Sequence, residues 1–397
     1  MPERTIVPPW APDQSVAHCH GSLEDAGFWS RYLLPRFDAY LSEAGSYTVE
    51  QQAAQRSCLR TAVATLGPQH PHPHVRSALT KKGVPIEFSF NRSDAHLPTA
   101  RFYIEPLGPR TGTDEDPFRE QAFRLKGRDE MERAKSQKRS DDWIPNVFLG
   151  VDFVGPDRTM KHSFCPLLKL LAIGAERGCF TNYNTVVLDV VRKLPGCGAN
   201  MSAAVDSGAK VKRSKLFFNL VSADCVHPSN GKGRVKLYAR INCLAFACIC
   251  DAITLGGRLN DEVTMEGVRR LQSIWHLLLN DPACKRDADY SRPVAVESHL
   301  RGIEVNWEIT NRQPVPQAKV YVPIYLFHAN DLEANRSLCS VFRKHNWHDW
   351  AEGRYAKMLR TTFPEADFAT TNINTWISFC YYQQRGSYMT LYHCPPL

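Results

Sequence analysis

The chain contains 397 residues, of which 43% are hydrophobic and 23% charged, and this globular composition excludes a disordered or fibrous protein. Its 49 basic and 41 acidic residues leave a net charge of +8, which is modest for a nucleic-acid-binding protein and suits an anionic small ligand. No stretch reaches the ~20 apolar residues of a membrane-spanning helix. The thirteen cysteines are an odd number behind a polar N-terminus, so we expect reduced thiols in a cytoplasmic protein.

Helix-like and strand-like patterns alternate along the chain, usually two at a time. In chain order, the first half is expected to hold helices over 23–44 and 49–66, strands over 85–91 and 100–106, a charged helix or loop over 118–138, strands over 149–154 and 160–165, and helices over 167–176 and 183–194.

A glycine-rich basic linker over 195–213 leads into the second half. There the pattern predicts strands over 215–226 and 234–241, helices over 243–254 and 262–280, strands over 302–310 and 319–326, helices over 332–346 and 350–363, and strands over 375–383 and 388–393.

Five antiparallel strand pairs separated by helices predict an α/β fold in which ten strands close into one barrel inside a ring of helices. A ten-stranded barrel has a wider, solvent-filled lumen than an eight-stranded one. We therefore expect an N-terminal segment, 1–20, and a single barrel domain over 21–397.

One face of several strands is polar, because side chains on a strand alternate between two faces. Arg101, Lys236 and Lys319 each stand two residues before a tyrosine, so that each cation shares a face with a phenol ring. The apolar faces need helices to cover them, and the polar faces are then expected to line the lumen. The alternative is an open sheet with these residues in solvent.

Cations that converge inside a cavity require an anion, and charge-assisted hydrogen bonds to phosphate contribute roughly 1.5–3 kcal/mol each. Tyrosine rings suit a second, cationic species, with cation–π contacts of about 0.5–2 kcal/mol. The two together describe an allylic diphosphate that ionises in a compartment without water. Glu87, in the same lumen, is suited to bind or deprotonate an N–H or O–H group of an aromatic acceptor.

Several motifs, in this order and spacing, resemble the fungal aromatic prenyltransferases of the dimethylallyltryptophan synthase type. They are PIEFSFN (85–91), ARFYIEPLGPRTGTDEDPF (100–118), GRVKLYA (233–239), TLGGRL (254–259), LQSIWHLLL (271–279), KVYVP (319–323), ISFCYY (377–382) and YMTLY (388–392). The resemblance covers nearly the whole chain. It implies a ten-stranded barrel of α-β-β-α units and a metal-independent enzyme of secondary metabolism, such as alkaloid biosynthesis, without a cofactor.

The resemblance also implies roles for individual residues. Glu87 is similar to the family's catalytic, acceptor-binding glutamate, and a structural salt bridge to a lumen arginine is the alternative. The residues expected to bind the diphosphate are Arg101, Lys161, Arg234, Lys236, Lys319 and Tyr388. Those expected to shield the carbocation are Tyr238, Tyr321 and Tyr392.

One position departs from the family pattern. The K-x-Y expected on the fourth strand is Lys161-His162-Ser163, so a serine stands where one shield tyrosine is expected. Either the extra room admits a longer donor, or an aromatic residue from elsewhere compensates, for which Trp376 is a candidate. Tyr103 is explained equally well by packing and by catalysis.

The expected function is transfer of an allylic prenyl group, dimethylallyl or longer, from its diphosphate to an electron-rich aromatic ring, with an indole of tryptophan or of a tryptophan-derived metabolite as the leading acceptor. These two small molecules and a second copy of the chain are the expected partners; no nucleic acid, membrane or metal is expected. No D-D-x-x-D motif for magnesium diphosphate occurs in the sequence. The alternatives are a phenolic or polyketide acceptor, a diphosphate-hydrolysing enzyme and a non-catalytic ligand-binding barrel.

Overall fold

The computed structural model describes residues 23–397 apart from several internal segments. Those segments are 73–74, 76, 78, 108–146, 165–209, 212–213, 225–233, 242, 292–301 and 311–312. The N-terminal segment 1–20, the elements expected over 118–138, 167–176 and 183–194, and most of the linker over 195–213 therefore lie outside the described residues.

The described helices follow the expected order. They are α1 (Leu23–Ala44), α2 (Val49–Val63), α7 (Phe246–Ile253), α8 (Glu262–Leu278), α9 (Asp331–Lys344) and α10 (Tyr355–Thr362), with a 3-10 turn at Pro282–Lys285. The single helix expected over 350–363 is wrong in one respect. The helical segment is kinked at Gly353, between Trp350 and the start of α10, because Gly353 has a non-helical φ of 120°, which an L side chain rarely adopts.

The described strands are long enough to span a barrel wall. They are β1 (Ile86–Ser93), β2 (Thr99–Ile104), β3 (Val147–Val154), β4 (Asp157–Phe164), β7 (Phe217–Asp224), β8 (Arg234–Ile241), β9 (Ile303–Thr310), β10 (Gln313–Val322), β11 (Asn374–Tyr382) and β12 (Gly386–His393), with a separate short pair, β5 (Lys210–Val211) and β6 (Ser214–Lys215). The strand expected over 319–326 starts earlier and ends at Val322, because Pro323 has no N–H for a sheet hydrogen bond and Ile324–Leu326 forms a 3-10 turn.

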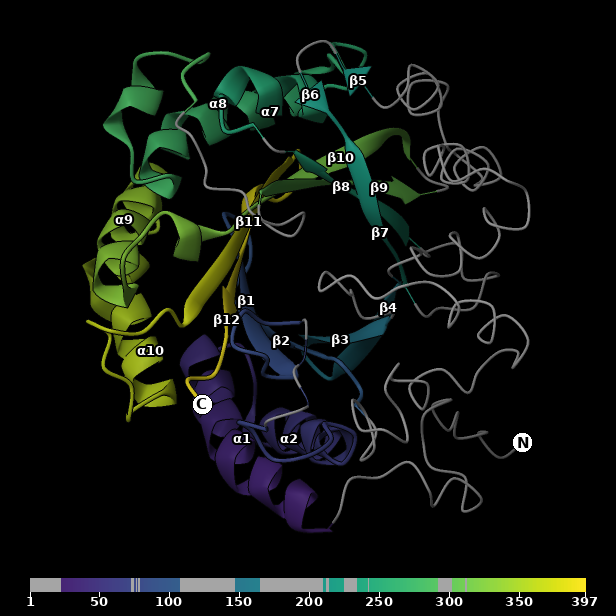
Figure 1. The fold of residues 1–397 in the computed structure, drawn as a ribbon, viewed down its shortest axis with the longest axis vertical. Helices are drawn as coiled ribbons and strands as arrows, with labels where there is room; N and C mark the ends of the chain where they lie inside the picture. Colours follow the sequence, from purple (N-terminus) through teal and green to yellow (C-terminus); the bar gives the residue numbers. More distant parts are fainter. Residues whose placement is uncertain are drawn as a thin grey trace.

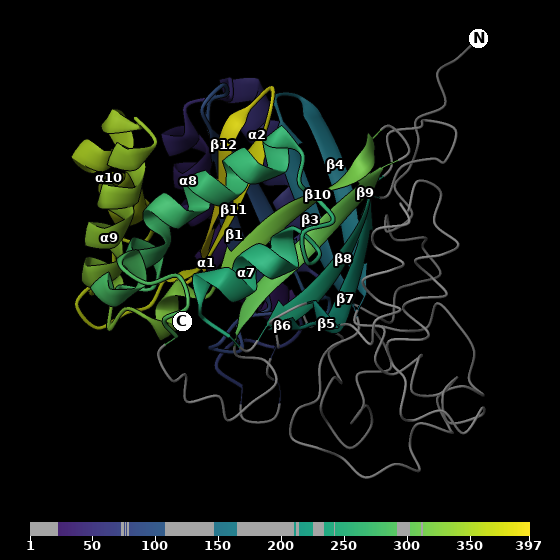
Figure 2. The same cartoon turned by 90° about the horizontal axis from the view of Figure 1, so that it is seen from above.

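Ten of these strands close into one barrel, as the sequence predicts, in the order β1-β12-β11-β10-β9-β8-β7-β4-β3-β2. The barrel closes because β1 pairs antiparallel with both β2 and β12, and this pairing excludes the open-sheet alternative. Figure 1 shows the helices outside the ring of strands, from α1 and α2 through α10 and α9 to α8 and α7. Figure 2 shows α7 and α8 lying across the strands, and α8 contacts β10 and β11.

The apolar core lies between the barrel wall and the helices. Phe37 of α1 packs against three strands at once, with ring centroids 5.5 Å from Phe88, 5.9 Å from Phe102 and 5.7 Å from Phe153. These phenylalanines are completely buried and point outward from the barrel. Because side chains alternate along each strand, the neighbours of these phenylalanines, among them Glu87 and Arg101, point into the barrel interior.

A buried polar network fastens α1 and α10 to the end of the sheet. His393 lies on the outer face of β12, with its Nδ1 atom 2.7 Å from the Tyr40 hydroxyl and its Nε2 atom 2.8 Å from the Tyr355 hydroxyl. The Tyr355 hydroxyl also lies 2.5 Å from Oδ1 of Asn374. The Asp331 carboxylate in turn accepts hydrogen bonds from the Asn374 backbone and side-chain amides. Each buried polar group named here therefore has a partner, as a low-dielectric interior requires.

Candidate active site

Glu87 is buried in the barrel interior and contacts a hydroxyl group. Only 5% of its surface is exposed, and its Oε1 atom lies 2.6 Å from the Thr375 hydroxyl. Burial raises the pKa of Glu87 to about 8, an effect that the Thr375 hydroxyl only partly offsets. In the described part of the chain, Glu87 therefore contacts a threonine instead of forming the salt bridge with an arginine that the sequence left open.

Arg101, Lys161 and Asp152 form a first charged cluster. Arg101 of β2 is opposite Asp152 of β3 in the sheet register and forms an ion pair with it, with 3.0 Å between Nη2 and Oδ2. The Lys161 ammonium forms a second ion pair with the same carboxylate, and all three side chains are nearly inaccessible to water. Burial by itself raises the pKa of Asp152, but Arg101 and Lys161 hold that pKa below its usual value.

Arg234, Lys236, Glu308 and Asp224 form a second charged cluster beside the first. Arg234 Nε lies 2.6 Å from Asp224 Oδ2, and Lys236 Nζ lies 3.6 Å from Glu308 Oε2. Burial by itself raises the pKa of Glu308, but Lys236 and Arg234 outweigh it and bring the pKa to about 2. Burial lowers the pKa of Lys236 to about 8 even though Glu308 opposes this. Glu308 thus carries a charge at neutral pH, and so does most of the Lys236 population.

The two clusters share one electrostatic environment. Repulsion by Arg101 of the first cluster contributes to lowering the pKa of Lys236 and of Lys319. Lys319 is 8% exposed, and its Nζ lies 4.4 Å from the centre of the Tyr388 ring. The cations that the sequence predicted to bind a diphosphate, together with Tyr388, therefore lie in one region of the barrel interior.

The three predicted shield tyrosines form one cluster. Tyr238, Tyr321 and Tyr392 are each at most 8% exposed, and Tyr103, Leu220 and Trp376 pack against them. Asn306 donates a hydrogen bond of 3.0 Å to the Tyr321 hydroxyl, which fixes this ring. Burial raises the pKa of the Tyr321 and Tyr392 phenols well above the usual value, so both rings stay neutral. The interior thus brings neutral aromatic faces near the group of cations.

Sequence reasoning missed the acidic partners of these cations. Asp152, Asp224 and Glu308 lie on the polar faces of their strands, so the alternation of side chains would have placed them inside the barrel. Which cation each one meets depends on register. Arg101 is opposite Asp152 and Lys236 is opposite Glu308, and these pairings follow only from the folded sheet.

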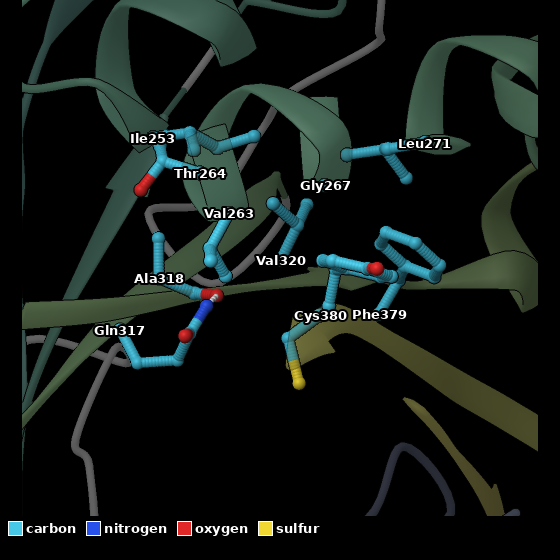
Figure 3. A pocket seen from close by; sticks show the side chains of 11 residues that line it. Ile253, Val263, Thr264, Gly267, Leu271, Gln317, Ala318, Val320, Phe379 and Cys380 are labelled. Carbon is cyan, nitrogen blue, oxygen red and sulfur yellow. Dashed lines mark hydrogen bonds between the residues drawn. The ribbon is translucent and has the colours of Figure 1, made fainter. Parts of the chain in front are cut away.

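A hollow outside the barrel offers no comparable chemistry. It lies between α8 and the strands β10 and β11, and none of the residues that line it is charged. Figure 3 shows Val320 directed toward the helix, whereas the side chains of Gln317 and Cys380 point away from it. This hollow therefore lacks the cations that hold a diphosphate.

No group of three or more histidine, cysteine, aspartate or glutamate side chains in the described ranges is arranged to bind a metal ion. Within the same ranges, no helix combines the length and apolarity needed to cross a membrane.

Comparison with known proteins identifies the family. A model of the tryptophan dimethylallyltransferase family matches residues 25–126 and 120–358. The chain belongs to this family. It is 28% identical over 409 residues to the indole prenyltransferase tdiB of Emericella nidulans, a match that covers 93% of this chain and 95% of the relative. It is 29% identical to the indole diterpene prenyltransferase terF of Tolypocladium album, with 93% of each covered.

Solved structures agree with this dimethylallyltransferase assignment. The NotF prenyltransferase in complex with brevianamide F and DMSPP is 25% identical, with a TM-score of 0.71 and 96% of this chain and 97% of that chain covered. AnaPT from Neosartorya fischeri, at 22% identity, has the same fold, with a TM-score of 0.73 over 93% and 94% of the two chains. The predicted family, the barrel fold and the class of reaction, prenyl transfer to an aromatic ring, are therefore confirmed.

Proposed function

We propose that this chain transfers a dimethylallyl group from dimethylallyl diphosphate to the indole ring of tryptophan or a tryptophan-derived metabolite. One observation carries the proposal. Arg101, Lys161 and Lys236 converge in the same barrel interior as the cluster of Tyr238, Tyr321 and Tyr392. An anion-binding region beside a neutral aromatic region matches the two fragments that an ionising allylic diphosphate produces.

The cations act on the leaving group. The bond between the allylic carbon and the diphosphate oxygen breaks, and its electron pair stays with the diphosphate. Arg101, Lys161, Arg234, Lys236 and Lys319 are assigned to the growing negative charge on this group, with Tyr388 beside Lys319. Ammonium and guanidinium groups in a site of low dielectric constant stabilise such charge more strongly than water does.

The tyrosines act on the allylic cation that remains. Tyr238, Tyr321 and Tyr392 present neutral ring faces, each of which stabilises a nearby cation by about 0.5–2 kcal/mol once water is excluded. They also keep water from adding to the cation, which would give the alcohol in place of the prenylated product.

Glu87 acts on the acceptor. Its carboxylate, positioned by Thr375, accepts the indole N–H and so orients the ring toward the allylic cation. A ring carbon attacks the cation, a carbon–carbon bond forms, and the loss of the proton from that carbon restores aromaticity. A lysine of the clusters or the diphosphate takes this proton.

Several relatives support an indole acceptor. The relative tdiB is named an indole prenyltransferase and terF an indole diterpene prenyltransferase, and the NotF structure is a complex with brevianamide F and DMSPP. The proposal includes a reducing, cytoplasmic compartment, which is supported by the cysteines of the described segments, since these are free thiols.

The test is incubation of the full chain with dimethylallyl diphosphate, EDTA and separate acceptors: tryptophan, a tryptophan-containing cyclic dipeptide, an indole diterpene and a phenolic polyketide. A prenylated indole product, identified by mass spectrometry and NMR, supports the proposal. If only the phenolic polyketide is prenylated, the acceptor is a phenol and not an indole. Release of dimethylallyl alcohol alone with every acceptor indicates a hydrolase, and diphosphate binding without turnover indicates a binding protein; either result overturns the proposal.

A further inference from the structure

Four tyrosine rings in the barrel interior form a row that stops before β4. The ring centroids are 5.8 Å apart for Tyr238 and Tyr321, 6.2 Å for Tyr321 and Tyr392, and 6.4 Å for Tyr392 and Tyr103. These rings come from β8, β10, β12 and β2, which are every second strand around this side of the barrel. The row leaves the wall formed by β3, β4 and β7 without a tyrosine of its own among the predicted shield residues.

That wall carries small side chains beside the row. Ser163 of β4 is opposite Ser222 of β7, and both are at most 5% exposed. Gly150 of β3 is opposite Lys161 on one side and Tyr103 on the other. Serine and glycine offer no ring face to a cation. Phe148 of β3 is opposite Ser163 in the register, but it is Tyr103 that packs against the cluster of shield tyrosines.

The Tyr103 ring packs against this wall. A Cβ atom added at Gly150 would lie 2.9 Å from both Cδ1 and Cζ of the Tyr103 ring, and nearer still to Cε1. Carbon atoms in a folded protein do not pack this closely, so the ring rests on the bare backbone of Gly150. Since Gly150 stands between Tyr103 and Lys161 in the register, the ring extends from β2 across β3 toward β4.

The hydroxyl end of this ring is held as well. Arg101 Nη1 donates to the Tyr103 hydroxyl across 3.4 Å, and the Arg101 guanidinium carbon lies 5.7 Å from the ring centre. Burial raises the pKa of Tyr103 to about 12, so the phenol stays neutral at neutral pH. Tyr103 therefore joins the aromatic row to the first charged cluster.

We infer that Tyr103 supplies the shielding ring that is missing at Ser163, and that Gly150 makes the room for it. Trp376, the candidate from the sequence, does not fit this role. It packs against the shield tyrosines from β11, but this strand is five strands from β4 around the ten-stranded barrel. Its ring also lies 6.2 Å from Tyr325 and 5.7 Å from the Arg240 guanidinium. The inference rests on the proposed prenyl transfer, because the ring is needed only if an allylic cation forms.

The consequence concerns how the allylic cation is consumed. With the ring in place, the cation is captured by the acceptor carbon. Without it, a water oxygen bonds to the allylic carbon and releases a proton, and the products are dimethylallyl alcohol and diphosphate. The ratio of alcohol to prenylated acceptor therefore reports on shielding separately from donor binding.

The experiment compares Tyr103→Leu with Tyr103→Phe in the full chain. We expect Tyr103→Leu to raise the ratio of alcohol to prenylated acceptor by about 2- to 30-fold, the range that loss of one cation–π contact corresponds to. Tyr103→Phe, which keeps the ring, restores a low ratio. Tyr381→Leu is the matched control, because Tyr381 lies beside Gly267 of α8 on the outside of the barrel. The affinity for inorganic diphosphate, measured by calorimetry, confirms that each variant retains the charged clusters.

Gly150→Ala tests the inference even if Tyr103→Leu folds poorly, and a double variant tests whether a ring on β4 rescues Tyr103→Leu. Gly150→Ala should raise the alcohol ratio with Tyr103 intact, because the added methyl group displaces the ring. Ser163→Tyr, introduced with Tyr103→Leu, should lower the ratio again by returning a ring to this wall.

Different experimental results would overturn the role of Tyr103 and the proposed function. If the wild-type chain forms prenylated indole and the alcohol ratio is the same in Tyr103→Leu, Gly150→Ala and Tyr381→Leu, the role of Tyr103 is overturned and the proposed function stands. If the wild-type chain prenylates no acceptor, the proposed function is overturned, and the role of Tyr103 with it.

Discussion

The Thr375 hydroxyl joins the side chain of Glu87 to the backbone of a different strand. It lies 2.6 Å from Oε1 of Glu87 and 3.1 Å from the carbonyl oxygen of Tyr392. A threonine hydroxyl has one proton, so it makes only one full-strength hydrogen bond as a donor. Both contacts are satisfied if Glu87 is protonated and donates to Thr375, which then donates to the carbonyl. The raised pKa of Glu87, about 8, agrees with this arrangement.

The pH dependence of acceptor use follows from this arrangement. The ionised carboxylate accepts an indole N–H more strongly than the protonated acid does, so kcat/KM for the acceptor should rise as the pH increases through about 8, the pKa of Glu87. Glu87→Gln should remove this rise and lower acceptor turnover about 10- to 100-fold, the effect of one charge-assisted hydrogen bond. Steady-state kinetics across the pH range measures both effects. Equal losses of acceptor turnover and diphosphate affinity would show that Glu87 is structural.

The stability of the same variant gives an independent check. The folded-state pKa of Glu87, about 8, lies above the ordinary value of 4.5, so ionisation of Glu87 opposes folding as the pH rises between these two values. Glu87→Gln should therefore raise the melting temperature relative to the wild type at a pH of about 9 and change it little at a pH of about 4. A lower melting temperature at the alkaline pH would contradict the buried, protonated state of this side chain.

Asp152→Asn should separate folding stability from anion affinity. Asp152 compensates the charges of Arg101 and Lys161, and removing one partner of a buried ion pair costs about 3–5 kcal/mol, so the free energy of unfolding without ligand should fall. The same change frees two cations from a competing carboxylate, so inorganic diphosphate should bind more tightly. Urea denaturation and calorimetry measure the two effects. Weaker diphosphate binding in a folded variant would show that Asp152 positions the cations instead of competing for them.

Lys236→Ala should weaken donor binding. Loss of one charge-assisted contact corresponds to roughly 1–3 kcal/mol, which is measured as the dissociation constant of a thiolo analogue of the donor. Lys357→Ala is the control, because the Lys357 side chain is 72% exposed and lies on the outer helix α10. In the wild type, donor affinity should also decline as the pH rises through about 8, where Lys236 loses its charge. Unchanged affinity in Lys236→Ala would remove this lysine from the donor site.

Tyr355→Phe should lower stability without affecting the donor site. The lost hydroxyl is near Oδ1 of Asn374 and Nε2 of His393, and buried polar atoms left without a partner cost about 1–3 kcal/mol. The free energy of unfolding in urea measures this loss. Tyr32→Phe is the comparison, because the Tyr32 hydroxyl donates to the Pro396 carbonyl at a more exposed position, and it should cost less. Equal losses would mean that the buried network adds nothing beyond an ordinary hydrogen bond.

Much of the fold was predictable because the repeating pattern is local. The alternation in 85–91 and 234–241 separates a polar from an apolar face, and ten such strands with helices between them predict a closed barrel whose polar faces point inward. The same alternation placed Glu87, Arg101, Lys236 and Lys319 in the interior. Helix ends were predictable where a local signal exists, as at Asp261, which accepts the Thr264 amide and begins α8.

The sequence alone therefore predicted the barrel and placed Arg101, Lys236 and Lys319 inside it, each with a tyrosine, because these features follow from residue type and spacing along single strands. The family, and the assignment of Lys161, Tyr388 and Tyr392 to the site, came from the resemblance of the ordered motifs. Only the tertiary structure decided which side chains meet. The pairing of Arg101 with Asp152 and of Lys236 with Glu308, and the contact of Thr375 with Glu87, depend on the register between strands that are far apart in the chain. The packing of the Tyr103 ring against Gly150 also depends on this register. Shifting β2 against β3 by one residue would turn the ring to the other face of the sheet.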